Sequence, residues 1–205
     1  GHLSSYYGNS FDGAELPGGV AISFVGPSGP EVGETPAPGA VSFPGFQIYN
    51  SICIRYGPDS GVVGTAYLDD DNDTIEHNCG TPSGTALGIF ANRLIGPYLS
   101  SFNNSIHSDP IGSDDVEGMR ALLDGEEPAN ARERDILEVA DGFGRVLAAV
   151  LAHEIGHSLG LQHSSPSTGN GDIMNASLSI APSVFYAFNA THWAQLQANL
   201  PGVNR

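Results

Sequence analysis

The chain has 205 residues, of which 40% are hydrophobic and 15% are charged, and this composition is typical of a folded protein. Its length allows one domain or two small lobes. Acidic residues outnumber basic residues by 23 to 7 and the formal net charge is −16, which argues against nucleic acid and anionic membranes as partners. No apolar run reaches the roughly 18 residues of a membrane span. We also expect that any export signal has been removed from this sequence.

The first third of the chain is rich in glycine and proline, which predicts strands joined by irregular loops. Residues 1–17 are polar and predict an N-terminal arm. An apolar run predicts a strand over 20–25, and the prolines that follow it predict a long loop over 26–45. Two further strands are predicted over 46–56, where apolar residues alternate, and over 61–68.

Helices are predicted mainly in the second half of the chain, from apolar residues at helical spacing. The predicted helix over 143–159 has the strongest apolar stripe, and Asn189 is placed to cap the last helix. The predicted helices cover residues 84–102, 114–123, 131–139, 143–159 and 190–200.

Three histidines, a glutamate and a glycine stand at fixed spacing at the end of the strongest helix. His153 and His157 are four residues apart, so one helical face directs both imidazoles to the same point, at the spacing of two zinc ligands. Glu154 follows the first of them, where it can take a proton from a zinc-bound water. Gly160 can adopt a left-handed backbone and turn the chain, which would bring His163 back as a third ligand. Three histidines leave the fourth zinc position open to water, as in a catalytic site.

The alternative to a metal site is an ordinary amphipathic helix that carries surface histidines. For a chain of this composition, the five fixed positions would co-occur by chance in roughly 5 of 100,000 cases. The glycine also falls where the helix has to end, and the pattern therefore favours a zinc site.

The spacing His-Glu-x-x-His-x-x-Gly-x-x-His resembles the signature of the metzincin zinc endopeptidases. Metzincins also carry a methionine turn beneath the metal, and Met174 fits that position, with a plain core methionine as the alternative. Within the metzincins the chain is most similar to the matrixins. Residues 152–164 nearly reproduce their active-site consensus, residues 64–71 resemble their Gly-Asp-Ala-His-Phe-Asp-Asp-Asp segment, and residues 188–197 resemble the start of their last helix.

The resemblance implies a mixed α+β fold of the metzincin type. A twisted mixed sheet and two long helices would form an upper lobe, and a small irregular lower lobe would end in a helix. We therefore expect an arm over 1–17, an upper subdomain over 18–160 and a lower subdomain over 161–205.

Some features of the chain depart from the matrixin pattern. Tyr67 stands where matrixins place a histidine of a second, structural zinc, so we predict only the catalytic zinc. The loop over 26–45 replaces their first helix. Residues 77–141 separate the acidic segment from the active-site helix by more than in matrixins without inserted modules, which leaves open whether this part contains an insertion.

Five carboxylates crowd into eight residues after the strand predicted over 61–68. Like charges at this density repel one another unless a cation or solvent screens them. The spacing is not that of an EF-hand, and Ca²⁺ binding and a solvated turn are the two interpretations. The candidate calcium ligands are Asp69, Asp70, Asp71, Asp73 and Glu76.

Cys53 and Cys79 are the only cysteines and predict one disulfide, with two free thiols as the alternative. The sequence around Cys79 also weakly resembles the matrixin propeptide segment whose thiolate caps the zinc. Strands precede it here, and its arginine and aspartate are missing. Together with the acidic surface and the absence of lysine, a disulfide indicates an extracellular protein.

These observations predict a secreted, monomeric zinc endopeptidase. One catalytic Zn²⁺ would be held by His153, His157 and His163, with Glu154 as the general base for the zinc-bound water. The strand over 61–68 would pair with an extended peptide or protein substrate. The alternatives are a catalytically silent zinc-bearing adhesion or binding module, and a zinc amidase that acts on a non-protein amide.

Overall fold

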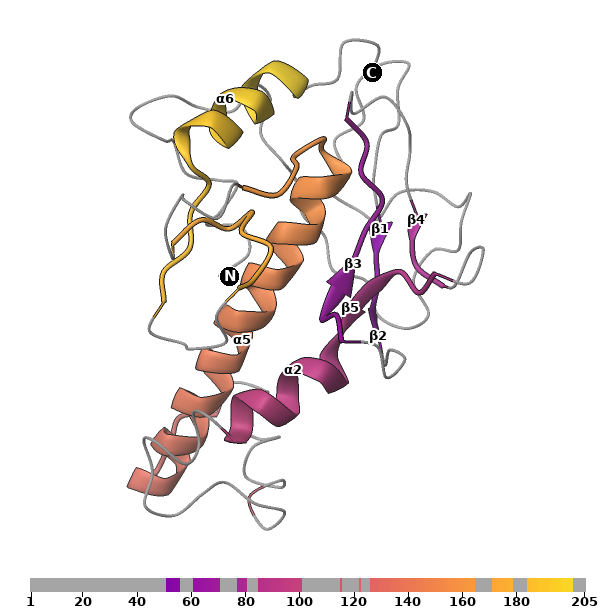
Figure 1. Ribbon diagram of the computed structural model, residues 1–205. Helices are drawn as coiled ribbons and strands as arrows, with labels where there is room; N and C mark the ends of the chain where they lie inside the picture. The colour runs from indigo at the N-terminus through magenta and orange to yellow at the C-terminus, as the bar shows by residue number, and fades with distance from the viewer. Residues whose placement is uncertain are drawn as a thin grey trace, which may run out of the picture.

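A computed structural model gives the arrangement of the chain (Figure 1). The predicted arm over 1–17, strand over 20–25 and loop over 26–45 lie outside the residues that it describes, as does most of the predicted helix over 114–123. The described residues are 51–55, 61–70, 77–80, 85–100, 115, 122, 126–164, 171–178 and 184–200.

The described residues form a mixed α+β fold, as the sequence predicts. The strands are β1 (Ser51–Ile52), β2 (Ile54–Arg55), β3 (Gly64–Thr65), β4 (His77–Asn78) and β5 (Gly88–Phe90), and the helices are α2 (Ala91–Tyr98), α5 (Ala131–Ser158) and α6 (Ala190–Asn199).

The strands pair in two groups. One is a mixed three-stranded sheet of order β2-β5-β3, in which β5 runs parallel to β2 and antiparallel to β3. The other is a parallel pair of β1 and β4. β3 therefore stands at the edge of the larger sheet among the described strands, within the region predicted as a strand over 61–68.

The helix predicted over 84–102 is wrong in its first part, because Gly88–Phe90 forms the central strand β5 and α2 begins only at Ala91. Gly88 has a φ of +115°, which no α-helix accommodates. The apolar residues that follow it fit both a helix and a fully buried strand, and periodicity does not separate the two in so short a run. Pairing with β2 and β3 decides in favour of the strand.

The helices predicted over 131–139 and 143–159 are a single helix of 28 residues, α5. Asn130 caps its start by accepting a hydrogen bond from the Glu133 amide at 2.9 Å. The Glu133 side chain in turn accepts one at 2.6 Å from the amide of Ala129, one residue before the position that a capping box would use. The helix continues through Gly142, a buried residue. A glycine there costs about 1 kcal/mol relative to alanine but does not end the helix.

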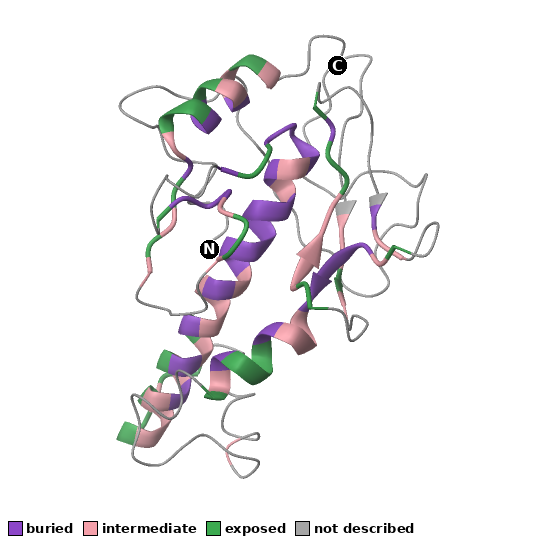
Figure 2. Ribbon diagram, in the orientation of Figure 1, coloured by how far each residue is buried: buried purple, intermediate pink, exposed green. Residues whose placement is uncertain are grey.

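Most of the core lies along one side of α5. Figure 1 shows α5 running along the molecule, and it contacts α2, β1, β3 and β5. The buried positions form a stripe that widens toward its C-terminal half (Figure 2). Tyr98 of α2 packs its ring against Phe143 and donates a hydrogen bond to the carbonyl oxygen of Val139 at 2.8 Å, which fixes α2 against α5.

The last helix forms as predicted. Asn189 accepts a hydrogen bond from the amide of His192 at 2.8 Å and so caps α6. Trp193 and Leu196 are buried and belong to the same core as Met174. α6 thereby packs onto the segment that follows α5.

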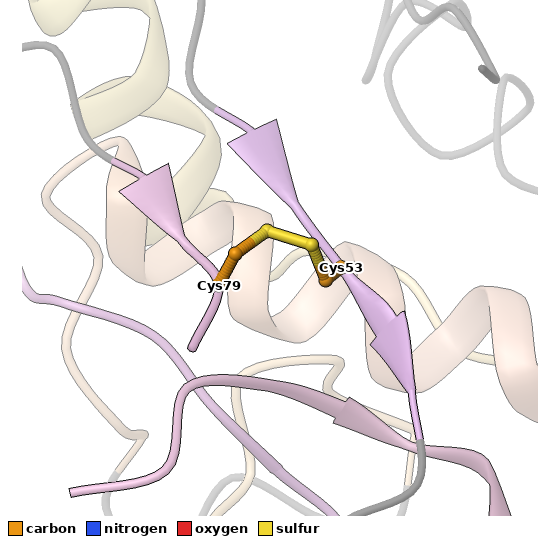
Figure 3. The surroundings of a disulfide bond; sticks show 2 residues. All are labelled: Cys53 and Cys79. Atoms are coloured by element: carbon orange, nitrogen blue, oxygen red, sulfur yellow. A yellow bond between two sulfur atoms is a disulfide. The ribbon is translucent and has the colours of Figure 1, made fainter. Parts of the chain in front are cut away.

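The structure contains the predicted disulfide between Cys53 and Cys79, whose Cα atoms lie 5.2 Å apart (Figure 3). It joins the residue between β1 and β2 to the residue after β4. Next to it, Asn78 is fully buried. Asn78 accepts a hydrogen bond from the amide of Tyr67 at 2.6 Å and donates one to Ser158 at 3.1 Å. The disulfide and Asn78 therefore tie the strands to the C-terminal end of α5.

Candidate metal centre

α5 ends in a tight bend at Gly160, as the sequence predicts. The amide of Leu161 donates to the carbonyl of Gly156 at 2.9 Å, and the amide of Gly160 donates to that of His157 at 3.0 Å, the two hydrogen bonds of a Schellman motif. Gly160 has a φ of +88°, in the region that favours glycine. A Cβ atom there would also lie within 2.8 Å of the backbone oxygens of Asp69 and Asp70. Glycine is therefore required at this bend for two independent reasons.

The bend brings His163 back to the two histidines on the helix. The Nε2 atoms of His153 and His157 are 3.1 Å apart, and each lies 3.2 Å from Nε2 of His163. His153 is buried, His157 is partly buried and His163 is exposed, so the cluster reaches the surface on the side of His163. The three histidines named from the sequence form one group.

Two of the imidazoles are held by backbone carbonyl oxygens. Nδ1 of His153 lies 2.7 Å from the carbonyl oxygen of Ile173, and Nδ1 of His157 lies 2.7 Å from that of Leu161. A carbonyl oxygen only accepts hydrogen bonds, so each Nδ1 has to be the protonated donor. In the neutral tautomers the Nε2 atoms then carry lone pairs that point into the cluster.

Burial favours these neutral forms. Desolvation lowers the pKa of His153 to about 4, although the hydrogen bond to Ile173 opposes this change. Desolvation also lowers the pKa of His157, against the opposing effect of the bond to Leu161. Both imidazoles are therefore unprotonated near pH 7, which is the state that binds metal ions.

The geometry of the cluster fits a zinc ion. Two nitrogen ligands of a tetrahedral zinc, with Zn–N bonds of about 2.0–2.1 Å, lie about 3.3 Å apart, close to the observed 3.1–3.2 Å. Converging lone pairs repel one another unless a cation lies between them. In the described part of the chain, the group able to hold a metal consists of these three histidines alone, a donor set that leaves a coordination position for water or substrate.

Glu154 lies between α5 and the edge strand β3. It is 5% exposed, and a Cβ atom on Gly64 would lie 2.5 Å from its Oε1 atom. Desolvation raises the pKa of Glu154 to about 7, and a hydrogen bond from the backbone of Ala66 opposes the rise. A carboxylate with a pKa near neutrality is suited to accept and release a proton at physiological pH.

Met174 lies directly under the histidine-bearing part of α5. Its side chain is fully buried, and a Cβ atom on Gly156 would lie 2.5 Å from its sulfur atom. The amide of Ser164, the residue after His163, donates to the carbonyl of Met174 at 2.8 Å. Met174 therefore packs against the helix turn that carries the histidines, and its assignment as a methionine turn stays a prediction.

The predicted calcium ligands are only partly described. Asp69 is buried, and its amide donates to the carbonyl of His157 at 3.2 Å. Asp70 accepts a hydrogen bond from Gln162 at 3.2 Å. Asp71, Asp73 and Glu76 lie outside the described residues, so calcium binding stays a prediction.

Several residues that shape the site were not predicted from the sequence. Gly64 and Gly156 leave room for Glu154 and Met174, and Asp172 and Asn78 connect distant segments around the histidines. Gly156 could have been recognised from the sequence. A glycine destabilises a helix by about 1 kcal/mol relative to alanine, so a glycine inside a strong helix often has a packing reason. The side-chain partners of Asp172 and Asn78 stand at irregular separations, from 8 residues for Ser164 to 80 residues for Ser158, which gave no comparable signal.

Comparison with known proteins gives the family of the chain. A histidine cluster and a buried glutamate at a glycine bend are consistent with a metalloendopeptidase of the metzincin type. The model of the matrixin family matches residues 50–186, which is more than half of the chain, and the chain belongs to this family. No curated protein and no solved structure matches it significantly. In the described part of the chain, no helix is both long and apolar enough to cross a membrane.

Proposed function

We propose that the protein is a secreted zinc endopeptidase in which Glu154 acts as the general base. The observation that carries the proposal is the convergence of three Nε2 atoms within 3.2 Å of one another, on the helix that also bears a buried glutamate. Membership of the matrixin family supports a metallopeptidase.

His153, His157 and His163 would hold the metal ion, and Met174 would support them from below. When bound, zinc would supply a Lewis acid that activates water and polarises a carbonyl group. Glu154 would take a proton from the attacking water and deliver it to the leaving amine. Its pKa of about 7 supports both steps, because a group that titrates near the working pH can serve as base and then as acid.

The edge strand would bind the substrate. β3 pairs with β5 on one side only among the described strands, which leaves its other side open to an extended peptide by β-augmentation. Gly64 and Ala66 contact Glu154, so a peptide paired with this strand would lie beside the proposed base. Tyr67 and Leu68 are 45% and 47% exposed and could contact substrate side chains.

Secretion, calcium binding and a monomeric state complete the proposal. The disulfide between Cys53 and Cys79 supports an oxidising compartment, as does the family. Calcium would be held by the acidic segment that begins at Asp69 and Asp70.

Digestion of a proteome-derived peptide library, read by mass spectrometry, tests the activity. We expect cleavage that 1,10-phenanthroline abolishes and that added Zn²⁺ restores. Zinc bound without any cleavage would point instead to a silent binding module, and hydrolysis confined to non-peptide amides would point to an amidase.

The variant Glu154→Ala tests the assigned base. We expect kcat/KM to fall by a factor of about 10² to 10⁴, while elemental analysis still finds zinc. Glu138→Ala is the matched control, because Glu138 is exposed on the same helix and far from the histidines. Unchanged turnover in Glu154→Ala would remove Glu154 from the mechanism.

A further inference from the structure

A buried carboxylate lies at the junction of three segments below the histidine cluster. Asp172 is 4% exposed. Its Oδ2 atom accepts hydrogen bonds from the hydroxyl of Ser164 and the side-chain amide of Asn189, both at 2.5 Å, and its Oδ1 atom accepts one from the amide of Met174 at 3.0 Å. Nδ1 of His192 is buried and has no hydrogen-bond partner among the described residues, and it faces Oδ1 at 3.6 Å.

These contacts hold Asp172 as an anion. Burial alone would raise the pKa of Asp172, but the hydrogen bonds from Ser164, Met174 and Asn189, together with the electrostatic effect of the nearby His192, outweigh burial and lower it. An ionised carboxylate accepts all of these hydrogen bonds at once, whereas the NH₂ group of an asparagine would face either the side-chain amide of Asn189 or the backbone amide of Met174, both of which are donors. The junction therefore favours aspartate over asparagine.

The junction is linked to two of the histidines by different routes. On one side, Asp172 precedes Ile173, whose carbonyl oxygen accepts the hydrogen bond from Nδ1 of His153 at 2.7 Å. On the other, Asp172 holds Ser164, which directly follows His163 and also donates its amide to Met174. The carboxylate of Asp172 thus connects the backbone that holds the imidazole of His153 to the segment that carries His163.

We propose that Asp172 is a positioning residue for the metal centre, which orients His153 through Ile173 and His163 through Ser164. The inference rests on the proposed role of the three histidines as metal ligands. Groups that orient metal ligands through such outer hydrogen bonds typically contribute a factor of 10 to 100 to metal affinity. Asp172 does not bind the metal or the substrate itself.

The test uses Co²⁺ as a probe that reports on its ligands through its visible absorption. Metal-free full-length chains are titrated with Co²⁺ in competition with a chelator of known affinity, and the spectrum at saturation is recorded. For Asp172→Asn we expect Co²⁺ affinity to fall 10- to 100-fold and the saturated spectrum to change in band position or intensity. Asp115→Asn is the matched control. Asp115 pairs with Arg132, which stands 25 residues before His157 on α5 and is therefore about 37 Å from it along the helix. The Asp115→Asn variant should therefore keep the Co²⁺ affinity and the spectrum of the wild type.

A second variant covers the case in which Asp172→Asn does not fold. Ser164→Ala removes the single hydrogen bond from the His163 side, and we expect a several-fold loss of Co²⁺ affinity with a changed spectrum. The inference would be overturned if the variants that fold keep the Co²⁺ affinity and the spectrum of the wild type and differ only in a lower melting temperature of the metal-free chain. Asp172 would then be a structural residue. A wild-type chain that does not bind Co²⁺ would overturn both proposals, whereas one that binds Co²⁺ and cleaves no peptide would overturn the protease proposal alone.

Discussion

Gly64 of the edge strand and Glu154 of α5 lie so close together that a Cβ atom on Gly64 would stand 2.5 Å from Oε1 and 3.0 Å from Cγ and Cδ of the glutamate. Real Cβ atoms do not approach other atoms this closely, so any side chain at residue 64 has to displace the carboxylate. The edge strand thereby fixes the place of the proposed base, in addition to its proposed contact with substrate.

Gly64→Ala should therefore lower peptide hydrolysis while metal binding persists. We expect kcat/KM to fall at least tenfold, because a displacement of about 1 Å in a reacting group can cost a factor of 100. Steady-state kinetics together with zinc content measure both effects. Gly61→Ala is the control, since no atom of the described residues lies within 4 Å of a Cβ atom there, and it should behave like the wild type. Equal activity in the two variants would contradict the proposed position of Glu154.

The parts of the site that are local in sequence were predictable. His153, His157 and Gly160 belong to one helix end, and helical spacing and the backbone freedom of glycine determine how they are arranged. The return of His163 follows from the same bend. Asn189 likewise caps α6 through a contact only three residues long.

The parts that depend on distant partners were not predictable. Gly88–Phe90 resembles the start of a helix in the sequence, and only pairing between β2 and β3 makes it a strand. Residues 140–142 separate two helices predicted from the sequence, yet α5 continues through them, and Phe143 packs there on Tyr98 of α2. Tertiary contacts override local preference in both cases.

The bend at Gly160 allows strain and crowding to be separated. Gly160→Ala would force alanine into a left-handed backbone and press its Cβ atom against the backbone of Asp69 and Asp70. Gly80 has a similar φ of +87°, but a Cβ atom there would meet no atom of the described part of the chain within 4 Å. Gly80→Ala should therefore cost only the backbone strain of about 1–2 kcal/mol. Urea unfolding should show a clearly larger loss for Gly160→Ala, which should also weaken zinc binding because His163 follows the bend. Equal losses in the two variants would mean that the contact with the acidic segment does not constrain the bend.

The stability of the metal-free chain should depend on pH through Glu154. Burial raises its pKa from 4.5 to about 7, so between these values the folded chain keeps a proton that the unfolded chain has lost. The contribution of Glu154 to the free energy of unfolding is therefore undiminished below pH 4.5, falls as pH rises and is fully lost above pH 7. The shift corresponds to about 3 kcal/mol.

The variant Glu154→Gln removes this ionisation. In urea unfolding of metal-free protein, it should be more stable than the wild type by up to about 3 kcal/mol at pH 8 and by no more than about 1 kcal/mol at pH 5. His153 titrates in both chains, and its contribution cancels in the difference. Glu138→Gln, an exposed position on the same helix, should show no such trend, and a pH-independent difference for Glu154→Gln would mean that Glu154 is not desolvated in solution.

The disulfide should contribute measurably to stability. It closes a loop across 26 positions of sequence, and loop closure of this size stabilises the folded state by about 3–4 kcal/mol through the entropy of the unfolded chain. The variant with Cys53→Ser and Cys79→Ser should lose about this much in urea unfolding. Reductant should destabilise the wild type to the same extent and leave the variant unchanged. Since Asn78 next to Cys79 links Tyr67 to Ser158 on α5, the reduced protein should also lose peptide hydrolysis at lower urea concentrations than the oxidised protein. A wild type whose unfolding midpoint does not respond to reductant would contradict a disulfide in the folded protein.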